Sequence, residues 1–332
     1  GTQTSFRIEL SEDSKTLDEV VVVGFGTQKK VNLTGAVTSV DTKALASRPV
    51  SQVGQALQGV VPGLNLSTPD LGGQLGQTMN VNIRGTGTIG KGSSASPLIL
   101  IDGMEGNMNN LNPEDIENIS VLKDAASSSI YGSRAAFGVI LITTKKGKAG
   151  KMQVNYNNSF RYSGPTSLPN QLDSYRFANY FNDAAINQGG SVIFDEETID
   201  RIQKYMAGEI TTTTIANGTN WHFHEKANDN VNWWKKHFQW AWSNEHNISL
   251  NGGTEKLQYY VSGSYLNQDG NLRYGNDNYK RYNATAKVNT QINKYVDFNI
   301  NTKFVRFDLD NPVYLEEGGL LYHDIARMWP MM

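Results

Sequence analysis

The chain has 332 residues, a formal net charge of -2, a pI near 6.3, and no cysteine. This length corresponds to about two domains. The charge lacks the basic excess that binds phosphate groups, which excludes nucleic acid as a partner. The absence of cysteine excludes disulfides, thiolate catalysis and cysteine-ligated metals within this chain.

No stretch approaches the roughly 18 consecutive apolar residues that a transmembrane helix requires. The first ten residues, Gly1 to Leu10, lack the charged start and apolar run of a signal peptide, so we expect that any signal peptide is already absent. Strands of a membrane barrel hide their lipid face in alternation, so that alternation must be examined directly.

Residues 1–14 contain one alternating segment, Thr4 to Glu12, which predicts a single strand whose partners lie upstream. Residues 15–32 begin with KTLDEVVVVGFG, in which four β-branched residues follow two acids and precede glycines. This composition predicts an extended segment with no helix.

Residues 33–150 mix short strands with short helices, which predicts a compact α+β domain. We expect a helix over residues 52–58, with Ser51 as its N-cap and Gly59 ending it in the left-handed conformation. A helical turn begins at Asn112, and small residues predict another short helix over 124–132. Strands are expected over residues 34–40, 63–67, 119–123 and 138–144, and the last is apolar throughout, which is typical of a central buried strand.

Beyond residue 150, apolar and polar residues alternate in five segments, each near or above the ~9 to 11 residues that cross a bilayer at barrel tilt. The alternating apolar positions are Met152, Val154, Tyr156, Phe160 and Tyr162; Trp240, Trp242, Ile248 and Leu250; Leu257, Tyr259, Val261 and Tyr265; Tyr282, Ala284, Ala286, Val288 and Ile292; and Val296, Phe298, Ile300 and Phe304.

The connections between these segments are unequal, being tight at residues 252–255 and 293–295 and long at 164–239 and 268–278. Short turns on one side and long loops on the other are typical of an outer-membrane barrel, although a soluble sandwich would also alternate. Five strands cannot close a barrel, since the smallest spanning barrels have eight. We therefore expect residues 151–332 to be the first strands and loops of a larger one.

Seven motifs are spread along the chain: DEVVVVGFG at 18–26, LQGVVPG at 57–63, NIRGTG at 82–87, PLILIDG at 97–103, LNPEDI at 111–116, VLKDAA at 121–126 and IYGSRAAFGVILITTKKG at 130–147. In order and spacing these motifs resemble the plug region of SusC-like TonB-dependent outer-membrane transporters, the starch-utilisation-system and RagA-like type. One departure is Phe137, where the family usually has Asn.

The resemblance implies an α+β plug domain at 33–150 followed by an antiparallel all-β transmembrane barrel, which in plugged transporters has about 22 strands. Residues 1–14 would then be the tail of a carboxypeptidase-regulatory-like β domain, and residues 15–32 a TonB box and linker. The implied function is energy-driven import of large nutrients, most often oligosaccharides, across the outer membrane. The implied partners are TonB with ExbB and ExbD, a SusD-like surface lipoprotein, the glycan and outer-membrane lipid, with no cofactor and no catalysis.

The TonB box is predicted at Asp18, Glu19, Val20, Val21, Val22, Val23 and Gly24. An extended segment can add as a strand to a sheet edge of another protein, with backbone hydrogen bonds providing the grip. The alternative is that the four valines form one more buried strand of the plug.

Arg84 and Arg134 lie in the motifs NIRG and GSRAA, at positions resembling plug arginines that pair with carboxylates on the barrel wall. They are candidate lock residues. The alternative is a surface ion pair, which contributes about 0 to 1 kcal/mol.

Other patterns have ordinary explanations. Gly85, Gly87 and Gly90 spell G-x-G-x-x-G, but a strand and not a helix is expected after them, so nucleotide binding is disfavoured. His222, His224 and Glu225 lie in a long polar loop, and we predict no metal site there.

The tryptophans have two interpretations. Trp233 and Trp234 are candidates for stacking on sugar rings, while an aromatic girdle or loop core is the alternative for all the tryptophans of residues 221–242.

Three functions remain compatible with the sequence. The first is a glycan importer, the second imports peptides or metal chelates by the same mechanism, and the third is a secreted glycan-binding or adhesive β domain without transport. Dependence of the full-length product on detergent separates the third from the other two.

Overall fold

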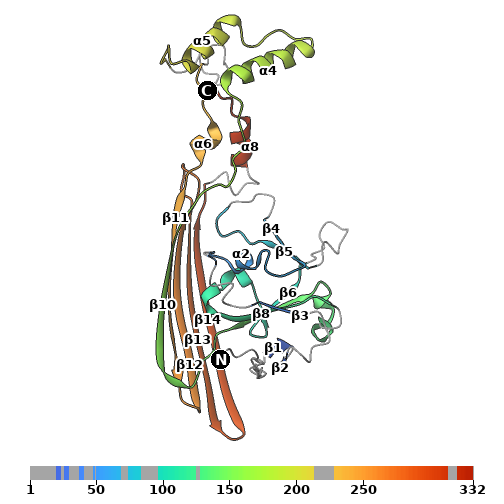
Figure 1. The fold of residues 1–332 in the computed structure, drawn as a ribbon, viewed down its shortest axis with the longest axis vertical. Coiled ribbons are helices and arrows are strands. Elements are labelled where there is room, and N and C mark those ends of the chain that lie inside the picture. The colour runs from blue at the N-terminus through green and yellow to red at the C-terminus, as the bar shows by residue number, and fades with distance from the viewer. Residues whose placement is uncertain are drawn as a thin grey trace, which may run out of the picture. The chain divides into compact units, whose positions relative to one another are not determined.

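The computed structural model describes residues 20–23, 26–29, 37–40, 48, 50–68, 74–83, 96–124, 128–212, 228–312 and 320–331. The chain divides into two compact units (Figure 1). The first, called here the α+β unit, comprises Gly1–Ser67 and Thr78–Lys146. The second, called the sheet unit, comprises Thr68–Gln77 and Gly147–Met332. The predicted tail at residues 1–14 lies outside the described residues.

A five-stranded sheet organises the α+β unit, in the order β3-β8-β9-β6-β7. Strand β9 lies at its centre, antiparallel to β8 and parallel to β6, and its buried Val139, Ile140 and Ile142 confirm the predicted central strand. The strands are β3 (Val37–Val40), β6 (Leu98–Ile101), β7 (Met104–Glu105), β8 (Ile116–Leu122) and β9 (Val139–Thr144).

The turn between β6 and β7 has positive φ at Asp102 (50°) and Gly103 (88°). Positive φ at both central residues defines the type I′ turn, for which Asp-Gly is a preferred sequence. The Asp102 carboxylate also accepts hydrogen bonds from the Thr144 backbone N–H (2.8 Å) and hydroxyl (2.7 Å). The PLILIDG motif thereby links the β6–β7 hairpin to the end of β9.

Helix α2 (Val53–Leu57) and the hairpin of β4 (Leu64–Ser67) with β5 (Asn80–Ile83) contribute to the same apolar core. The prediction of Ser51 as N-cap is wrong, because the helix starts one residue later and Gln52 holds that position without a side-chain hydrogen bond. Gly59 has a φ of 73°, which confirms the left-handed conformation predicted after the helix.

Short helical turns precede and follow strand β8. The cap at Asn112 is confirmed, since its side chain accepts the Glu114 N–H at the start of the 3₁₀ turn Pro113–Asp115. Another 3₁₀ turn spans Met108–Asn110. The helix predicted over residues 124–132 is described only in part: the Ser128 N–H donates to the Asp124 carbonyl at 3.1 Å, residues 125–127 lie outside the described residues, and the 3₁₀ segment Ser129–Ala135 follows, with positive φ at Gly132 (71°).

Strand β1 (Val20–Val23) pairs antiparallel with β2 (Gly26–Lys29) in a separate two-stranded sheet. The extended conformation predicted for the four valines is confirmed. This small sheet has no hydrogen-bonded third strand among the described residues.

Five long antiparallel strands form the sheet of the sheet unit, in sequence order (Figure 1). All five strands predicted from the alternation are confirmed, as are the tight connections after residues 253 and 293 and the longer ones after 163 and 269. The strands are β10 (Gly150–Ser163), β11 (Ala241–Gly253), β12 (Leu257–Asp269), β13 (Asn278–Asn293) and β14 (Val296–Asp310).

Helices occupy the long connection between β10 and β11, for which the sequence pattern predicts a polar loop. They are α4 (Ser174–Asn187), α5 (Glu196–Met206) and α6 (Trp233–His237), and α8 (Leu320–Arg327) follows β14. No helix within the described ranges is long and apolar enough to cross a membrane.

Candidate functional site

The five-stranded sheet has a mostly polar face and an apolar face, and its central strands β11, β12 and β13 bury the mostly polar one. On β11, Ser243, Glu245 and Asn247 are 4 to 8% exposed, whereas Trp242 and Ile248 on the opposite face are 60% and 50% exposed. Strands β10 and β14 continue the exposed apolar face, with Phe160 and Phe304 as examples. Soluble domains bury the apolar side chains, so this inverted pattern is typical of a sheet whose outer face contacts lipid.

A buried charged cluster lies on the polar face, formed by Arg161 of β10, Glu245 of β11 and Arg281 of β13. The Glu245 carboxylate accepts from Arg161 at 3.1 Å and from Arg281 at 3.3 Å. The three side chains are only 12%, 10% and 1% exposed. The cluster ties three strands together across the sheet, and both arginines pair with the same carboxylate.

An apolar contact interrupts the polar face next to this cluster. Leu266 of β12 stands between Glu245 and Arg281 in the strand register, and it packs with Tyr279 and with Leu75. Leu75 comes from residues 68–77, which the chain contributes to the sheet unit from between β4 and β5. The sequence pattern did not predict this contact. One signal was present, because Leu266 is apolar but lies on the face of β12 opposite to the alternating apolar residues such as Val261 and Tyr265.

Aromatic side chains gather where strands β10 and β11 meet the long connection. The Tyr162 ring lies 5.4 Å from Trp240 and 4.7 Å from Trp242, measured between ring centroids, and all three are more than half exposed. At the opposite end of the strands, Tyr295 lies in the turn between β13 and β14 and is 80% exposed, with the Lys294 ammonium 4.8 Å from its ring centroid. Aromatic belts at both ends of the strands are expected where a barrel crosses the membrane interfaces.

The helices between β10 and β11 share an aromatic core with the segment after α8. Trp329 lies 4.8 Å from Phe181 and 5.6 Å from Phe194 between ring centroids, and Met331 is fully buried beside them. The Pro330 carbonyl accepts the Val231 N–H at 2.7 Å. The connection after β10 and the segment after β14 therefore fold together as one structure, which the sequence pattern did not predict.

Trp233 and Trp234 both lie in α6 and are partly buried. The Trp233 indole N–H donates to the Trp329 carbonyl at 2.8 Å, and Trp234 stacks on Phe238. These contacts place Trp233 in the loop core, whereas sugar stacking by either indole stays a prediction.

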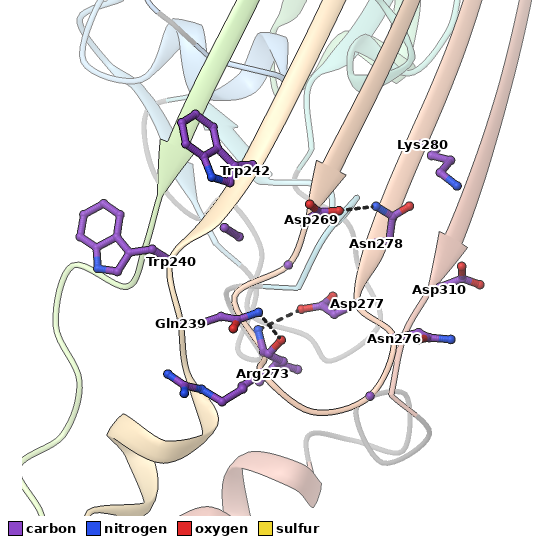
Figure 2. Close-up of a pocket in the computed structure, with 14 residues that line it drawn as sticks. Gln239, Trp240, Trp242, Asp269, Arg273, Asn276, Asp277, Asn278, Lys280 and Asp310 are labelled. Carbon is purple, nitrogen blue, oxygen red and sulfur yellow. Dashed lines mark hydrogen bonds between the residues drawn. The ribbon is translucent and has the colours of Figure 1, made fainter.

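A cavity of about 560 Å³ lies at the loop between β12 and β13 (Figure 2). Figure 2 shows the Trp240 and Trp242 rings to one side, apart from the carboxylates of Asp269, Asp277 and Asp310. Burial raises the pKa of the Asp277 carboxyl above its ordinary value; the Leu272 N–H opposes this shift and the charge of Asp269 adds to it. The rings and the acids do not converge on one point, so this cavity lacks the geometry of a sugar-stacking site.

The predicted coupling residues are only partly described. Val20 to Val23 form β1, while Asp18, Glu19 and Gly24 lie outside the described residues. Arg84 also lies outside them. Arg134 pairs with Glu105 inside the α+β unit, and both side chains are largely exposed (67% and 51%).

The described residues contain no group of three or more His, Cys, Asp or Glu side chains that could hold a metal ion. His222, His224 and Glu225 lie outside this part of the chain.

Comparison with known proteins identifies relatives of both units. The TonB-dependent Receptor Plug Domain family model matches residues 29–139. TonB-dependent receptor P3 of Formosa agariphila is 31% identical over 304 residues, covering 91% of this chain and 26% of that protein. TonB-dependent receptor SusC of Bacteroides thetaiotaomicron is 32% identical over 310 residues, covering 89% of this chain and 27% of that protein.

A solved structure of the RagAB peptide importer in its open-open state is similar over 89% of this chain and 33% of that chain, with a TM-score of 0.71 and 30% identity. The chain spans about a quarter of the length of the curated relatives it matches.

Proposed function

We propose, because the chain belongs to the SusC-like TonB-dependent receptors, that the full-length protein imports large nutrients across the outer membrane. In this proposal the α+β unit belongs to the plug and the five long strands belong to the barrel wall. The observation that carries the proposal is the inverted sheet, with Glu245 and Arg281 buried and Phe160 and Phe304 exposed. A secreted, water-soluble binding domain rarely exposes an apolar face of this extent.

Energy enters this mechanism through the segment Asp18 to Gly24. Strand β1 and its partner β2 form a two-stranded sheet, and isolated hairpins of this kind are marginally stable. Unpairing of β1 costs little, so its backbone can instead add to a sheet edge of TonB, which ExbB and ExbD energise.

Val22→Pro tests the coupling segment, because proline removes a backbone N–H from the added strand. The matched control is Val22→Thr, which keeps a β-branched residue. In full-length receptor we expect uptake of Val22→Pro to fall to the level of cells without TonB, with Val22→Thr near wild type. Equal uptake in the two variants contradicts the assignment.

Arg84 and Arg134 remain proposed locks between plug and barrel. Arg134 has an exposed partner, Glu105, within its own unit, and this pairing supports the surface ion-pair alternative. A lock role requires the Arg134 guanidinium to exchange that partner for a barrel carboxylate.

The proposed cargo is an oligosaccharide, delivered by a SusD-like lipoprotein and contacted by Trp233 and Trp234 among other groups. A peptide is the second candidate, favoured by the similarity to the RagAB peptide importer. Neither cargo requires a catalytic step by this chain.

Uptake into whole cells decides between these cargoes. Cells with and without the full-length receptor are compared for uptake of a fluorescent oligosaccharide mixture and a fluorescent peptide mixture, each in a TonB-positive and a TonB-deficient background. Oligosaccharide uptake that needs both receptor and TonB supports the first cargo, and peptide uptake with the same dependence supports the second. Uptake of neither class defeats both.

A further inference from the structure

Residues 68–77 belong to the plug-domain match by sequence, yet they belong to the sheet unit by structure. They connect β4 and β5, two strands of the α+β unit. The structure describes residues 74–77 of this connection, and Leu75 there is only 7% exposed.

Leu75 packs against an apolar spot on the buried face of the five-stranded sheet, which is otherwise mostly polar. Its partners Leu266 and Tyr279 are 1% and 8% exposed, and the three form a hydrophobic cluster of their own. Leu266 is flanked in the register by Glu245 and Arg281, which are joined at 3.3 Å. Leu75 therefore packs on the part of the sheet where the ion pair of Glu245 and Arg281 joins the strands on either side of Leu266.

Gly76 brings the connection against the Tyr279 ring. Its φ is 68°, and a Cβ atom there would lie 2.9 Å from Tyr279 Cε2 and 3.0 Å from Cδ2. Only glycine combines this backbone conformation with so close an approach. The contact requires glycine for two independent reasons, conformation and space.

We infer that residues 74–77 are an anchor, a piece of plug sequence that stays docked on the barrel wall while TonB displaces the α+β unit. The inference rests on the proposed function, since it assigns which part of the plug does not travel. The partner of the anchor is the surface formed by Leu266 and Tyr279.

Cross-linking the anchor to the wall tests this inference. Leu75→Cys and Leu266→Cys are introduced together into the full-length receptor and joined as a disulfide in whole cells by copper-phenanthroline oxidation. The 332-residue chain contains no cysteine of its own. We expect an efficient cross-link and TonB-dependent uptake within about twofold of the untreated cells. Failure to cross-link, or a cross-link that abolishes uptake, overturns the anchor.

A glycine pair tests why the anchor holds. Gly76 and Gly63 both have positive φ (68° and 77°), but a Cβ atom at Gly63 meets nothing within 4 Å. In a Leu75→Cys background, Gly76→Val should raise the rate of thiol labelling at residue 75 at least tenfold, whereas Gly63→Val should leave it within twofold. Equal rates in the two variants contradict the role assigned to the Gly76–Tyr279 contact.

The same cells separate failure of the anchor from failure of the proposed function. If uptake by the unmodified receptor does not depend on TonB, the proposed function fails. If uptake depends on TonB and the cross-link stops it, only the anchor fails.

Discussion

Strand β9 of the α+β unit and strand β11 of the sheet unit bury opposite kinds of side chain. Strand β9 buries Val139, Ile140 and Ile142, whereas β11 buries Ser243 and Glu245 and exposes Trp242 and Ile248. Apolar burial is favourable when the alternative is water. Lipid is as apolar as the side chains themselves, so the polar groups of a membrane sheet are directed inward.

The difference between the two strands teaches that hydrophobic pattern alone does not identify the inside of a fold. Alternation of period two gives the same strand assignment in either medium, while the exposed fraction of each face distinguishes the two. The effect expected in each of the following experiments depends on whether the substituted residue lies in the α+β unit or in the sheet unit.

Loss of the charge on Glu245 should have the largest effect. Glu245→Gln leaves Arg161 and Arg281 buried without their shared carboxylate, and removal of one partner from a buried ion pair typically costs about 3 to 5 kcal/mol. Urea unfolding of the full-length receptor measures the loss. In a double-mutant cycle with Arg281→Gln, we expect the double variant to lose less than the sum of the single losses. Additive losses would show that the two groups are not coupled.

A positive charge placed on each exposed surface should have the next largest effect. Phe304 in β14 and Met104 in β7 are exposed to nearly the same extent, 59% and 62%. We expect Phe304→Arg to cost up to about 2 to 4 kcal/mol in lipid vesicles, because arginine on the lipid face of a barrel is destabilising. Met104→Arg should stay within about 0.5 kcal/mol, the usual range for a surface change in water.

Unfolding in vesicles measures both variants. A Phe304→Arg receptor as stable as Met104→Arg would refute the assignment of the outer face to lipid.

A smaller effect is expected from Asp277, a half-buried polar group that lies outside the strands of the sheet unit. Burial raises its pKa above the ordinary value of 3.8, so its contribution to stability is complete below that pH and is lost as pH rises through the raised pKa. Amide exchange at residues 270–277, corrected for intrinsic rates, should show less protection at pH 7 than at pH 4. Asp277→Asn should remove this difference, and Asp310→Asn, at the same cavity, should keep it. An unchanged difference in Asp277→Asn contradicts the prediction.

Local patterns predicted much of this fold correctly. The five alternating strands, the buried strand β9, the Asn112 cap and the left-handed Gly59 all follow from residue type and spacing within a few positions. Such features are local because backbone preference and side-chain direction repeat over short distances.

Helices α4 and α5 were not predicted, although their capping signals are local. Asp173 and Asp195 each cap a helix by accepting a backbone N–H at 2.8 Å, and Phe177 and Phe181 have helical spacing. The polar composition of the whole connection favours a loop, and the prediction followed that composition instead of the caps. Only the core partner Trp329 was out of reach, since its packing against Phe181 joins residues far apart in sequence.

Some residues of the candidate site could likewise be predicted from the sequence, while others could not. The proposed coupling segment and the lock candidate Arg134 follow from a sequence resemblance. The Arg161–Glu245–Arg281 cluster and the contact of Leu75 with Leu266 depend on cross-strand register and on a connection that leaves its own unit. A single sequence contains the residues of these contacts but not their pairing.

The smallest effect is expected at Arg134, where the comparison between regions bears on the lock hypothesis. Its partner Glu105 is in the same unit and both are largely exposed, so Arg134→Gln should change stability by only about 0 to 1 kcal/mol. Glu105→Gln should have the same small effect, because each variant breaks the same ion pair. A lock to the barrel instead predicts that Arg134→Gln admits large antibiotics into cells carrying the full-length receptor while Glu105→Gln does not. Antibiotic sensitivity of the two variants, compared at equal receptor abundance, therefore separates an ion pair of the α+β unit from a bond that joins it to the wall.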